Sequence, residues 1–558
     1  MSVEEFEALL GDPRDTANPV GYTAVLAADE RQEMLSEGEL LLDSYGMNAE
    51  FVPAAYGGRL TRADRLAEVQ RALWRRDPCL GLGYGFSSLL GSVNIWTAGT
   101  DDQRRETADI LLGNGRIAAA FHELDHGNDF ANASCTARPA GDGWLVSGRK
   151  EIVTNLRRAD AVVLFARTAD TAGSRSHSQF LFRRADLPAA ALEDLPRFPS
   201  SGMRGVQLGG IGLTDCPLPG DALVGRVGQG IEIALRSYQL TRAVLPAVLL
   251  GPLDTALRLV LDCASERRLY AGVVADLPYV RAVVARALAD LLVIDAFSAV
   301  GLRALHLTPD AMGVYAPAAK YLTSRVLLDA FEDLRSVLGA QSYLREGPSA
   351  MFQKMARDVA PATFAHISRS ACLVTILPQL PRLARRFWNG GSAAPVELFE
   401  VGGELPLLDL ARLAPGVPSG DGILGTLSEL AETEPAATPV GRLARRFRDE
   451  LSVLADACAR LEPSDLAIGA APEAYALADR YTVLLAAAAA TAVWRNGHGS
   501  YPEAVLPGLL DRLAGRLGGA SVLTPAERES AEQALFELAL ERHRDGRLFD
   551  LSARHIKG

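Results

Sequence analysis

The sequence predicts an α+β protein in which two helical regions flank a small β domain, with a further helical domain at the C-terminal end. Apolar residues recur at helical spacing up to about residue 117 and again from about residue 231 to 385. Short apolar strands separated by turn residues occupy the segment between these two regions. A chain of 558 residues is long enough for three or four folding units.

Local patterns set the expected boundaries. Residues 1–117 are predicted to form helices joined by short loops, and residues 118–230 to form the β domain, with a hairpin at Asp142-Gly143. Residues 231–385 return to long helices with few turn residues. Residues 386–425 are rich in glycine and proline and are expected to connect the bundle to a C-terminal helical extension, residues 426–558.

Two helices of the extension carry start signals. One is expected to begin at Thr438-Pro439, because proline is favoured in the first helical turn. Another is expected to begin after Thr524, where the Thr524-Pro-Ala-Glu527 pattern is a capping box, and to end at Gly546.

Composition and charge exclude several classes of protein. Apolar residues make up 48% and charged residues 22%, which excludes a disordered chain or a coiled-coil rod. The net charge of −11 argues against nucleic acid as the main partner. The first residues are acidic where a secretory signal would be basic, and the longest apolar run, residues 481–494, is too short to span a bilayer. We therefore expect a cytoplasmic protein that binds no membrane.

Cysteine and lysine are both scarce. Six scattered cysteines without a Cys-x-x-Cys pair favour neither a disulfide framework nor a structural zinc site. Only four of the 57 basic residues are lysine, and we interpret the arginine excess as a GC-rich coding bias; the four are Lys150, Lys320, Lys354 and Lys557.

One motif points to metal chemistry but lies in the wrong context. His122-Glu-Leu-Asp-His126 matches the His-Glu-x-x-His pattern of zinc proteases, in which one helical face presents both histidines. Here Gly127-Asn128-Asp129 follows immediately and would break a helix, and no third ligand stands at the required spacing. We expect no metal site.

A series of short patterns appears in a fixed order along the chain. The series comprises Phe51–Gly58, Arg76-Asp77, Trp96–Thr100, Phe121–Asp129, Gly148–Asn155, Ser201–Gly205, Gly225–Gly230, Glu266–Tyr270 and Leu338–Ala340. Together these patterns resemble the acyl-CoA dehydrogenase/oxidase superfamily over residues 1 to about 380. The resemblance implies a small sandwich- or barrel-like β domain and a four-helix bundle. The added tail is more similar to acyl-CoA oxidases and very-long-chain dehydrogenases than to the short four-subunit enzymes.

The resemblance also implies FAD and assigns residues to it. Desaturation of an acyl thioester needs a base for the α-proton while flavin N5 takes the β-hydride. By resemblance, the loop with Phe121, His122, Gly127 and Asn128 runs beside the flavin. Ile152 stands where the family has a tryptophan against the flavin face, and Thr154 where it has a hydroxyl near N5. Arg267 stands where an arginine reaches the pyrophosphate across a dimer interface, beside Tyr270 in place of a phenylalanine.

Several positions depart from the family pattern. Gly339-Ala340-Gln-Ser-Tyr replaces Gly-Gly-x-Gly-Tyr, and Ser368 replaces a threonine that contacts the flavin. His366 occupies the usual position of the catalytic glutamate. Thr241, before Arg242, occupies the alternative glutamate position. Three hypotheses stay open: His366 is the base, a distant carboxylate such as Glu346 replaces it, or the dehydrogenation step is lost.

Function is expected to follow the family. The predicted reaction is α,β-dehydrogenation of a fatty acyl thioester, on an acyl carrier protein or CoA, in bacterial lipopeptide-type secondary metabolism. Oxygen or an electron-transfer flavoprotein would reoxidise the flavin. Since the tail would cover the surface that pairs dimers in shorter relatives, a homodimer is expected. The alternatives are a flavin monooxygenase or epoxidase and an inactive scaffold of the same fold.

Overall fold

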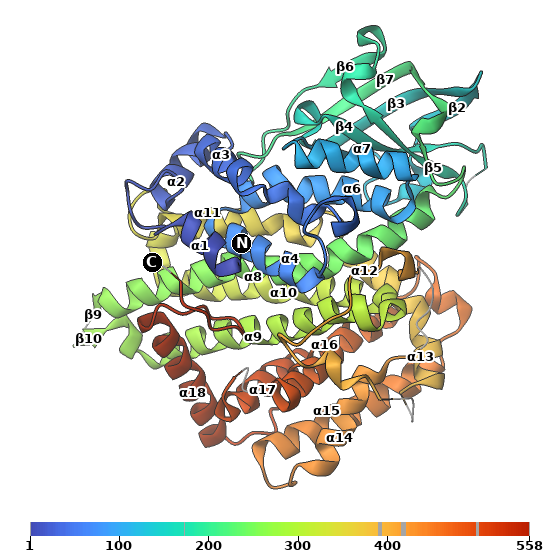
Figure 1. The fold of residues 1–558 in the computed structure, drawn as a ribbon. Helices are drawn as coiled ribbons and strands as arrows, with labels where there is room; N and C mark the ends of the chain where they lie inside the picture. Colours follow the sequence, from blue (N-terminus) through green and yellow to red (C-terminus); the bar gives the residue numbers. More distant parts are fainter. Residues whose placement is uncertain are drawn as a thin grey trace.

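A computed structural model of the chain describes residues 2–171, 173–269, 271–388, 393–414, 420–497 and 501–556. Three long helices cross the middle of the molecule, with the N-terminal helices and the β domain on one side of them and the C-terminal extension on the other (Figure 1). Along the chain, helices come first, the strands of the sheet follow, and further helices come after them.

The N-terminal region is helical, as predicted. Its first and last helices begin at capping boxes, Ser2 with Glu5 and Thr100 with Gln103. In the helix that follows Arg62, the apolar positions at helical spacing are buried. The helices are α1 (Val3–Leu10), α2 (Tyr22–Arg31), α3 (Ser36–Tyr45), α4 (Ala63–Arg76), α5 (Pro78–Leu80), α6 (Ser87–Ala98) and α7 (Asp101–Leu112).

The described strands of the β domain form one mixed sheet in the order β6-β7-β3-β2-β4-β5-β8, with β1 parallel to β4. The β2–β3 hairpin turns at Gly141 and Asp142, one residue earlier than predicted, because Gly141 takes the positive φ (+61°) that a tight hairpin needs. The strands are β1 (Ile117–Ala120), β2 (Thr136–Ala140), β3 (Gly143–Thr154), β4 (Ala161–Arg167), β5 (His177–Arg183), β6 (Leu192–Leu195), β7 (Leu208–Leu218) and β8 (Leu223–Val224).

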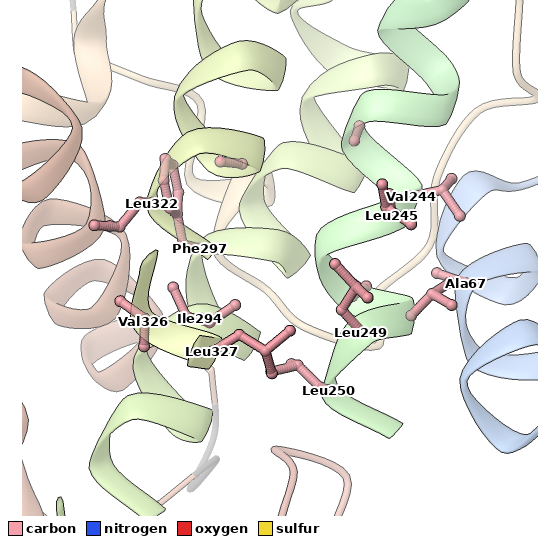
Figure 2. Packing of buried hydrophobic residues seen from close by; sticks show 14 of the residues in the cluster. Ala67, Val244, Leu245, Leu249, Leu250, Ile294, Phe297, Leu322, Val326 and Leu327 are labelled. Carbon is pink, nitrogen blue, oxygen red and sulfur yellow. The ribbon is translucent and has the colours of Figure 1, made fainter. Parts of the chain in front are cut away.

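The bundle is built on three long helices. Figure 2 shows their shared core, where Leu249 of the first, Phe297 of the second and Leu327 of the third are all buried. A short hairpin, β9 (Arg268–Leu269) and β10 (Gly272–Val273), joins the first two. The helices are α8 (Gly230–Glu266), α9 (Pro278–Leu307), α10 (Met312–Leu338), α11 (Ala350–Val359), α12 (Arg369–Ile376) and α13 (Leu380–Arg386).

The C-terminal extension packs on α9 and α10. Two of its helices begin at the predicted caps, Thr438 and Thr524. Asp421 ties the end of the connector to both layers, accepting hydrogen bonds from Tyr315 of α10 and from Tyr481 of the extension. The helices are α14 (Gly425–Thr433), α15 (Pro439–Ala459), α16 (Pro472–Asn496), α17 (Leu506–Arg516) and α18 (Pro525–Arg544).

Two helices, α8 and α16, are long and apolar enough to cross a bilayer. The apolar window of α8 is entirely buried inside the fold, and 78% of the window of α16 is buried. A helix that is apolar on all sides is also what the core of a large protein requires. We therefore interpret both as core helices.

Candidate functional site

The two positions at which the resemblance places a catalytic glutamate meet in the structure. His366 lies in the loop between α11 and α12, and Thr241 lies on α8, 125 positions earlier in the chain. The Nε2 atom of His366 is 2.7 Å from the Oγ1 atom of Thr241. The ring of Tyr238, one helical turn before Thr241, packs edge-on against His366 with 4.7 Å between centroids. Both positions therefore belong to one site.

Aromatic rings connect this site to the β domain. Tyr238 packs against Phe121, with 5.6 Å between ring centroids, and Phe121 stacks on Phe165 of β4 at 5.2 Å. Phe121 directly follows β1 and opens the loop that the resemblance places beside a flavin. The predicted base and the predicted flavin loop are thus neighbours, as the sequence argument requires.

The surroundings of His366 are cationic. Burial lowers the pKa of its imidazole well below the usual value, and the charges of Arg242, Lys320 and His122 lower that pKa further. No carboxylate among the described residues contributes to this shift. The imidazole is therefore neutral at neutral pH and available as a proton acceptor.

Two candidate site residues have strained backbones. His366 has a φ of +66° and Ile152 a φ of +54°, values that residues other than glycine rarely adopt. A β-branched side chain makes this conformation especially costly for Ile152. Such strain concentrates at functional sites, where the surrounding structure holds it in place. Both residues stand at positions that the resemblance assigns to the site.

Ile152 owes its conformation to an irregularity in β3. The register between β3 and β7 shifts between Lys150 and Val153, so Ile152 lies in a bulge. Its side chain remains 43% exposed. Beside it, the carboxylate of Glu151 accepts a hydrogen bond from the amide of Leu124, another exposed apolar residue. The bulge thus presents an apolar surface next to the Phe121 loop.

The glutamate of the His-Glu-x-x-His pattern is engaged in contacts within the protein. The Glu123 carboxylate is used within the protein: it accepts hydrogen bonds from the Lys150 ammonium at 2.7 Å and from the amides of Ser134 and Cys135. Among the described residues, the one cluster whose atoms could hold a metal lies elsewhere, at Asp77, Cys79 and Asp358, and a lysine ammonium occupies it. That the pattern binds no metal stays a prediction from the sequence.

Comparison with known proteins finds similarity to acyl-CoA dehydrogenases. Residues 228–366 match the family profile described as "Acyl-CoA dehydrogenase, C-terminal domain". The probable acyl-CoA dehydrogenase FadE25 of Mycobacterium tuberculosis is 24% identical over 335 residues, which is 59% of this chain and 84% of that protein. The chain is thus similar to acyl-CoA dehydrogenases over more than half of its length, and residues 228–366 match the C-terminal domain of that family.

Two solved structures share the fold over about two thirds of the chain. The prolyl acyl carrier protein oxidase AnaB matches with a TM-score of 0.60 at 17% identity, covering 68% of this chain and 98% of AnaB. The FAD complex of PigA matches with a TM-score of 0.59 at 19% identity, covering 68% of this chain and 95% of PigA. At these identities the similarity establishes the fold alone.

Other family positions near the site have local roles. Thr154 ends β3 and pairs with Leu208 of β7. The hydroxyl of Ser368 accepts the amide hydrogen of Ala371 and thereby caps α12. Gly127 takes a φ of +53° with open space where a Cβ would stand, and Asn128 follows it in the same turn.

A second group of family positions lies at the far end of α8. Arg267 is exposed and ends this helix, while Gly339 and Ala340 are exposed in the turn that ends α10. A contact of 3.3 Å between Cys263 and Gln341 brings the two turns together. Arg267 stands 26 positions after Thr241 along α8, roughly 39 Å of helix. The second group is therefore remote from His366, and Tyr270 lies outside the described residues.

Glu346, the alternative base, lies in an exposed loop beyond this turn. Its neighbour Arg345 forms an ion pair with Glu30 of α2. No contact within the described part of the chain joins Glu346 to His366. The geometry favours His366 over Glu346.

Sequence reasoning did not assign Arg242 and Lys320 to the candidate site. Each is buried in an otherwise apolar stretch of a long helix. The scarcity of lysine was a usable signal, because Lys150, Lys320 and Lys354 are all buried. A lysine kept inside the core of an arginine-rich protein points to a specific role more than a coding bias does.

The Glu123–Lys150 pair predicts a pH-dependent stability. Burial would raise the pKa of Glu123, but the Lys150 charge and the hydrogen bonds of the carboxylate outweigh burial and lower its pKa to about 2. Since 4.5 is the usual value, this carboxylate stabilises the fold above pH 4.5 and loses that contribution as the pH falls toward 2. We expect Glu123→Gln to flatten the acid branch of stability between these values, measured by urea unfolding at several pH values.

The matched control for this prediction is the exposed pair of Arg105 and Asp101. Asp101→Asn should leave the acid branch nearly unchanged, because exposed ion pairs contribute little to stability. Identical acid branches for Glu123→Gln and the unmutated protein would contradict the prediction.

Proposed function

We propose that the chain uses FAD to oxidise an acyl thioester at its α,β-bond, with His366 as the base. The observation that carries the proposal is the contact between His366 and Thr241, which unites both glutamate positions of the family in one site. The similarity to acyl-CoA dehydrogenases supports the reaction class. The similarity to AnaB, a prolyl acyl carrier protein oxidase by name, supports a carrier-bound acyl group as well as CoA. We further propose that the reaction belongs to bacterial secondary metabolism.

The residues beside the site fit a flavin. Ile152 and Leu124 present exposed apolar side chains that an aromatic ring system would cover. Thr154 supplies a hydroxyl two residues along β3, and the Phe121–Asn128 loop borders the same bulge through the Leu124–Glu151 hydrogen bond. When bound, FAD would supply the hydride acceptor for the β-carbon.

The chain's own part in the reaction is to accept the α-proton. Because Thr241 can donate its hydroxyl hydrogen to the carbonyl of Tyr238, its oxygen is free to accept the Nε2 hydrogen of His366. In that tautomer the Nδ1 atom carries the free lone pair, and no described residue bonds it. His366 then accepts the proton at Nδ1 while Thr241 keeps the ring oriented.

Ile152→Gly would separate the backbone strain of the bulge from the contact that the Ile152 side chain would make with FAD. Glycine adopts positive φ without strain, so the substitution should leave the free energy of unfolding of the flavin-free protein unchanged or raise it by about 1 kcal/mol. Loss of the exposed apolar side chain should weaken FAD binding by about tenfold. Fluorescence titration with FAD and urea unfolding would measure the two effects, and Ile211→Val, a conservative change at a buried residue of β7, serves as the control. Unchanged FAD affinity would contradict this role of Ile152.

The proposed function is tested by an absorbance spectrum and an anaerobic titration. We expect a bound flavin whose visible band is bleached by an acyl-CoA or an acyl carrier protein thioester. A flavin that no thioester bleaches, but that reacts with oxygen and substrate after external reduction, would favour the monooxygenase alternative. A protein that cannot be loaded with FAD would refute the enzymatic proposal.

We propose a homodimer for a geometric reason. Arg267 lies at the end of α8, and Gly339 lies in the turn that follows α10. Both are remote from His366, so within one chain they cannot contact the part of an FAD that lies beside His366. A second copy would let these residues serve the partner's site. The extension covers α9 and α10, which leaves these helices unable to form a further interface between dimers. Light scattering should give the mass of a dimer, and a tetramer would contradict the proposal.

A further inference from the structure

A buried cationic cluster, formed by Arg242 of α8 and Lys320 of α10, lies behind His366. Arg242 is 6% exposed and Lys320 is 1% exposed. The ammonium group of Lys320 donates a hydrogen bond to the carbonyl of Ala362, in the segment that leads to His366. Arg242 follows Thr241 directly and also acts on the pKa of His366. Both charges therefore border the site in which the α-proton would be removed.

Arg242 differs from every other arginine that is buried in the described chain. The other five each donate hydrogen bonds to carboxylates or backbone carbonyls; they are Arg75, Arg76, Arg258, Arg303 and Arg542. Arg242 donates no hydrogen bond to any described residue, and its Nε atom is sealed from solvent without a partner. A buried guanidinium donor without an acceptor is costly, because the Nε–H group loses its water and gains no hydrogen bond in return.

The charges around the cluster do not compensate it. Burial lowers the pKa of Lys320 to about 8, Cys372 opposes this shift, and the nearby charges of Arg369 and Arg242 add to it. Burial also lowers the pKa of Arg242, against small opposing contributions from Cys372 and Tyr238. No carboxylate of the described chain acts on either group. Neither Thr241 nor His366 carries a charge at neutral pH. These are the two positions where the family would place a carboxylate beside Arg242.

We propose that Arg242 and Lys320 bind a carboxylate carried by the acyl group of the substrate. The planar fork of a guanidinium matches a carboxylate with two parallel hydrogen bonds, and an ammonium adds a third donor. Because Thr241, which touches His366, is adjacent to Arg242, the carboxylate lies close to the α-carbon. The substrate is then the thioester of a short dicarboxylic acid. This inference rests on the proposed function for the thioester end of the ligand.

The test compares two ligands that differ in one group. Glutaryl-pantetheine carries a terminal carboxylate, and its terminal amide has the same shape without the charge. Calorimetry on the FAD-loaded protein should show that the carboxylate binds about 30-fold more tightly or better. Arg242→Met should reduce this ratio to near one, and Arg242→Lys should retain part of it. Equal affinities of the unmutated protein for the two ligands would overturn the proposal without recourse to any variant.

A matched control comes from the same neighbourhood. The guanidinium of Arg369 already donates to the hydroxyl and carbonyl of Ser324, so Arg369→Gln should change the ratio by no more than about twofold. If Arg242→Met keeps the affinity ratio between the carboxylate and amide ligands, Arg242 does not bind the carboxylate. The flavin spectrum, recorded in parallel, separates the two proposals. Tight binding of the carboxylate ligand without bleaching of the flavin would refute dehydrogenation but not the carboxylate site. Bleaching by both ligands at equal affinity would refute the carboxylate site but not dehydrogenation.

Discussion

His366→Ala should lower the rate at which an acyl thioester reduces the bound flavin by about 100- to 10,000-fold, the range that a positioned general base contributes. The substitution removes the proton acceptor whose Nε2 atom Thr241 holds at 2.7 Å. Because alanine leaves α8 and the Phe121 loop in place, FAD affinity should change by no more than a few-fold. Anaerobic stopped-flow reduction and FAD titration would measure the two quantities.

Two further variants make the role of His366 specific. His366→Gln keeps a group that can hydrogen-bond to Thr241 but accepts no proton, so it should be as slow as the alanine variant. His366→Glu restores the residue type of the family between Arg242 and Lys320, whose charges would keep the carboxylate ionised, and should recover at least tenfold over alanine. Equal reduction rates for the unmutated protein and His366→Gln would contradict the assignment.

The same residue sets the expected pH dependence. A base acts in its unprotonated form, and burial with nearby positive charge places the pKa of His366 well below the usual histidine value. The rate of flavin reduction should therefore stay constant as the pH falls through 6.5 and decline only at a lower pH. In His366→Glu the decline should also lie at low pH, since Arg242 and Lys320 stabilise the carboxylate. A decline centred near pH 6.5 in the unmutated protein would contradict a buried, cation-flanked base.

The element order was predictable because it depends on local patterns. Helical periodicity located α4, and the capping residues Thr438 and Thr524 located the starts of α15 and α18. The Asp142-Gly143 hairpin was predicted one residue too late, since both Gly141 and Gly143 are compatible with a turn and only the strand register decides between them. Periodicity fixes which faces are buried but says nothing about such a shift of one residue.

The sequence predicted which residues belong to the candidate site but not how they contact one another. Motif order located His366, Ile152 and the Phe121 loop, whereas the contact between His366 and Thr241 depends on how α8 packs against the loop before α12. Arg242 and Lys320 stayed unnoticed because a buried charge looks like any other charge in a sequence. Whether such a charge is compensated depends on the hydrogen-bond acceptors around it, and these are set by tertiary structure.

A second buried cationic group shows the opposite arrangement. Lys354 of α11 lies between Asp77 and Asp358, with its Nζ atom 2.6 Å and 2.5 Å from their carboxylates. Burial alone would lower the pKa of Lys354, but Asp358 and Asp77 raise it well above the usual value. Asp77 also caps α5 through the amide of Cys79, and Asp358 accepts the amide of Met203 from the β domain. This cluster therefore joins the N-terminal helices, the β domain and the bundle.

Lys354→Met should lower the free energy of unfolding by about 3–5 kcal/mol, because it leaves two carboxylates buried together without a counter-ion. Lys354→Met with Asp358→Asn should recover part of that loss, since asparagine keeps an oxygen for the amide of Met203 while one charge is removed. Urea unfolding of the FAD-free protein measures both, and Arg335→Met, at a partly exposed ion pair with Glu332, is the control with an expected loss below about 1 kcal/mol. A double variant as unstable as the single one would show that packing of the lysine stem, and not the uncompensated charge, holds the three regions together.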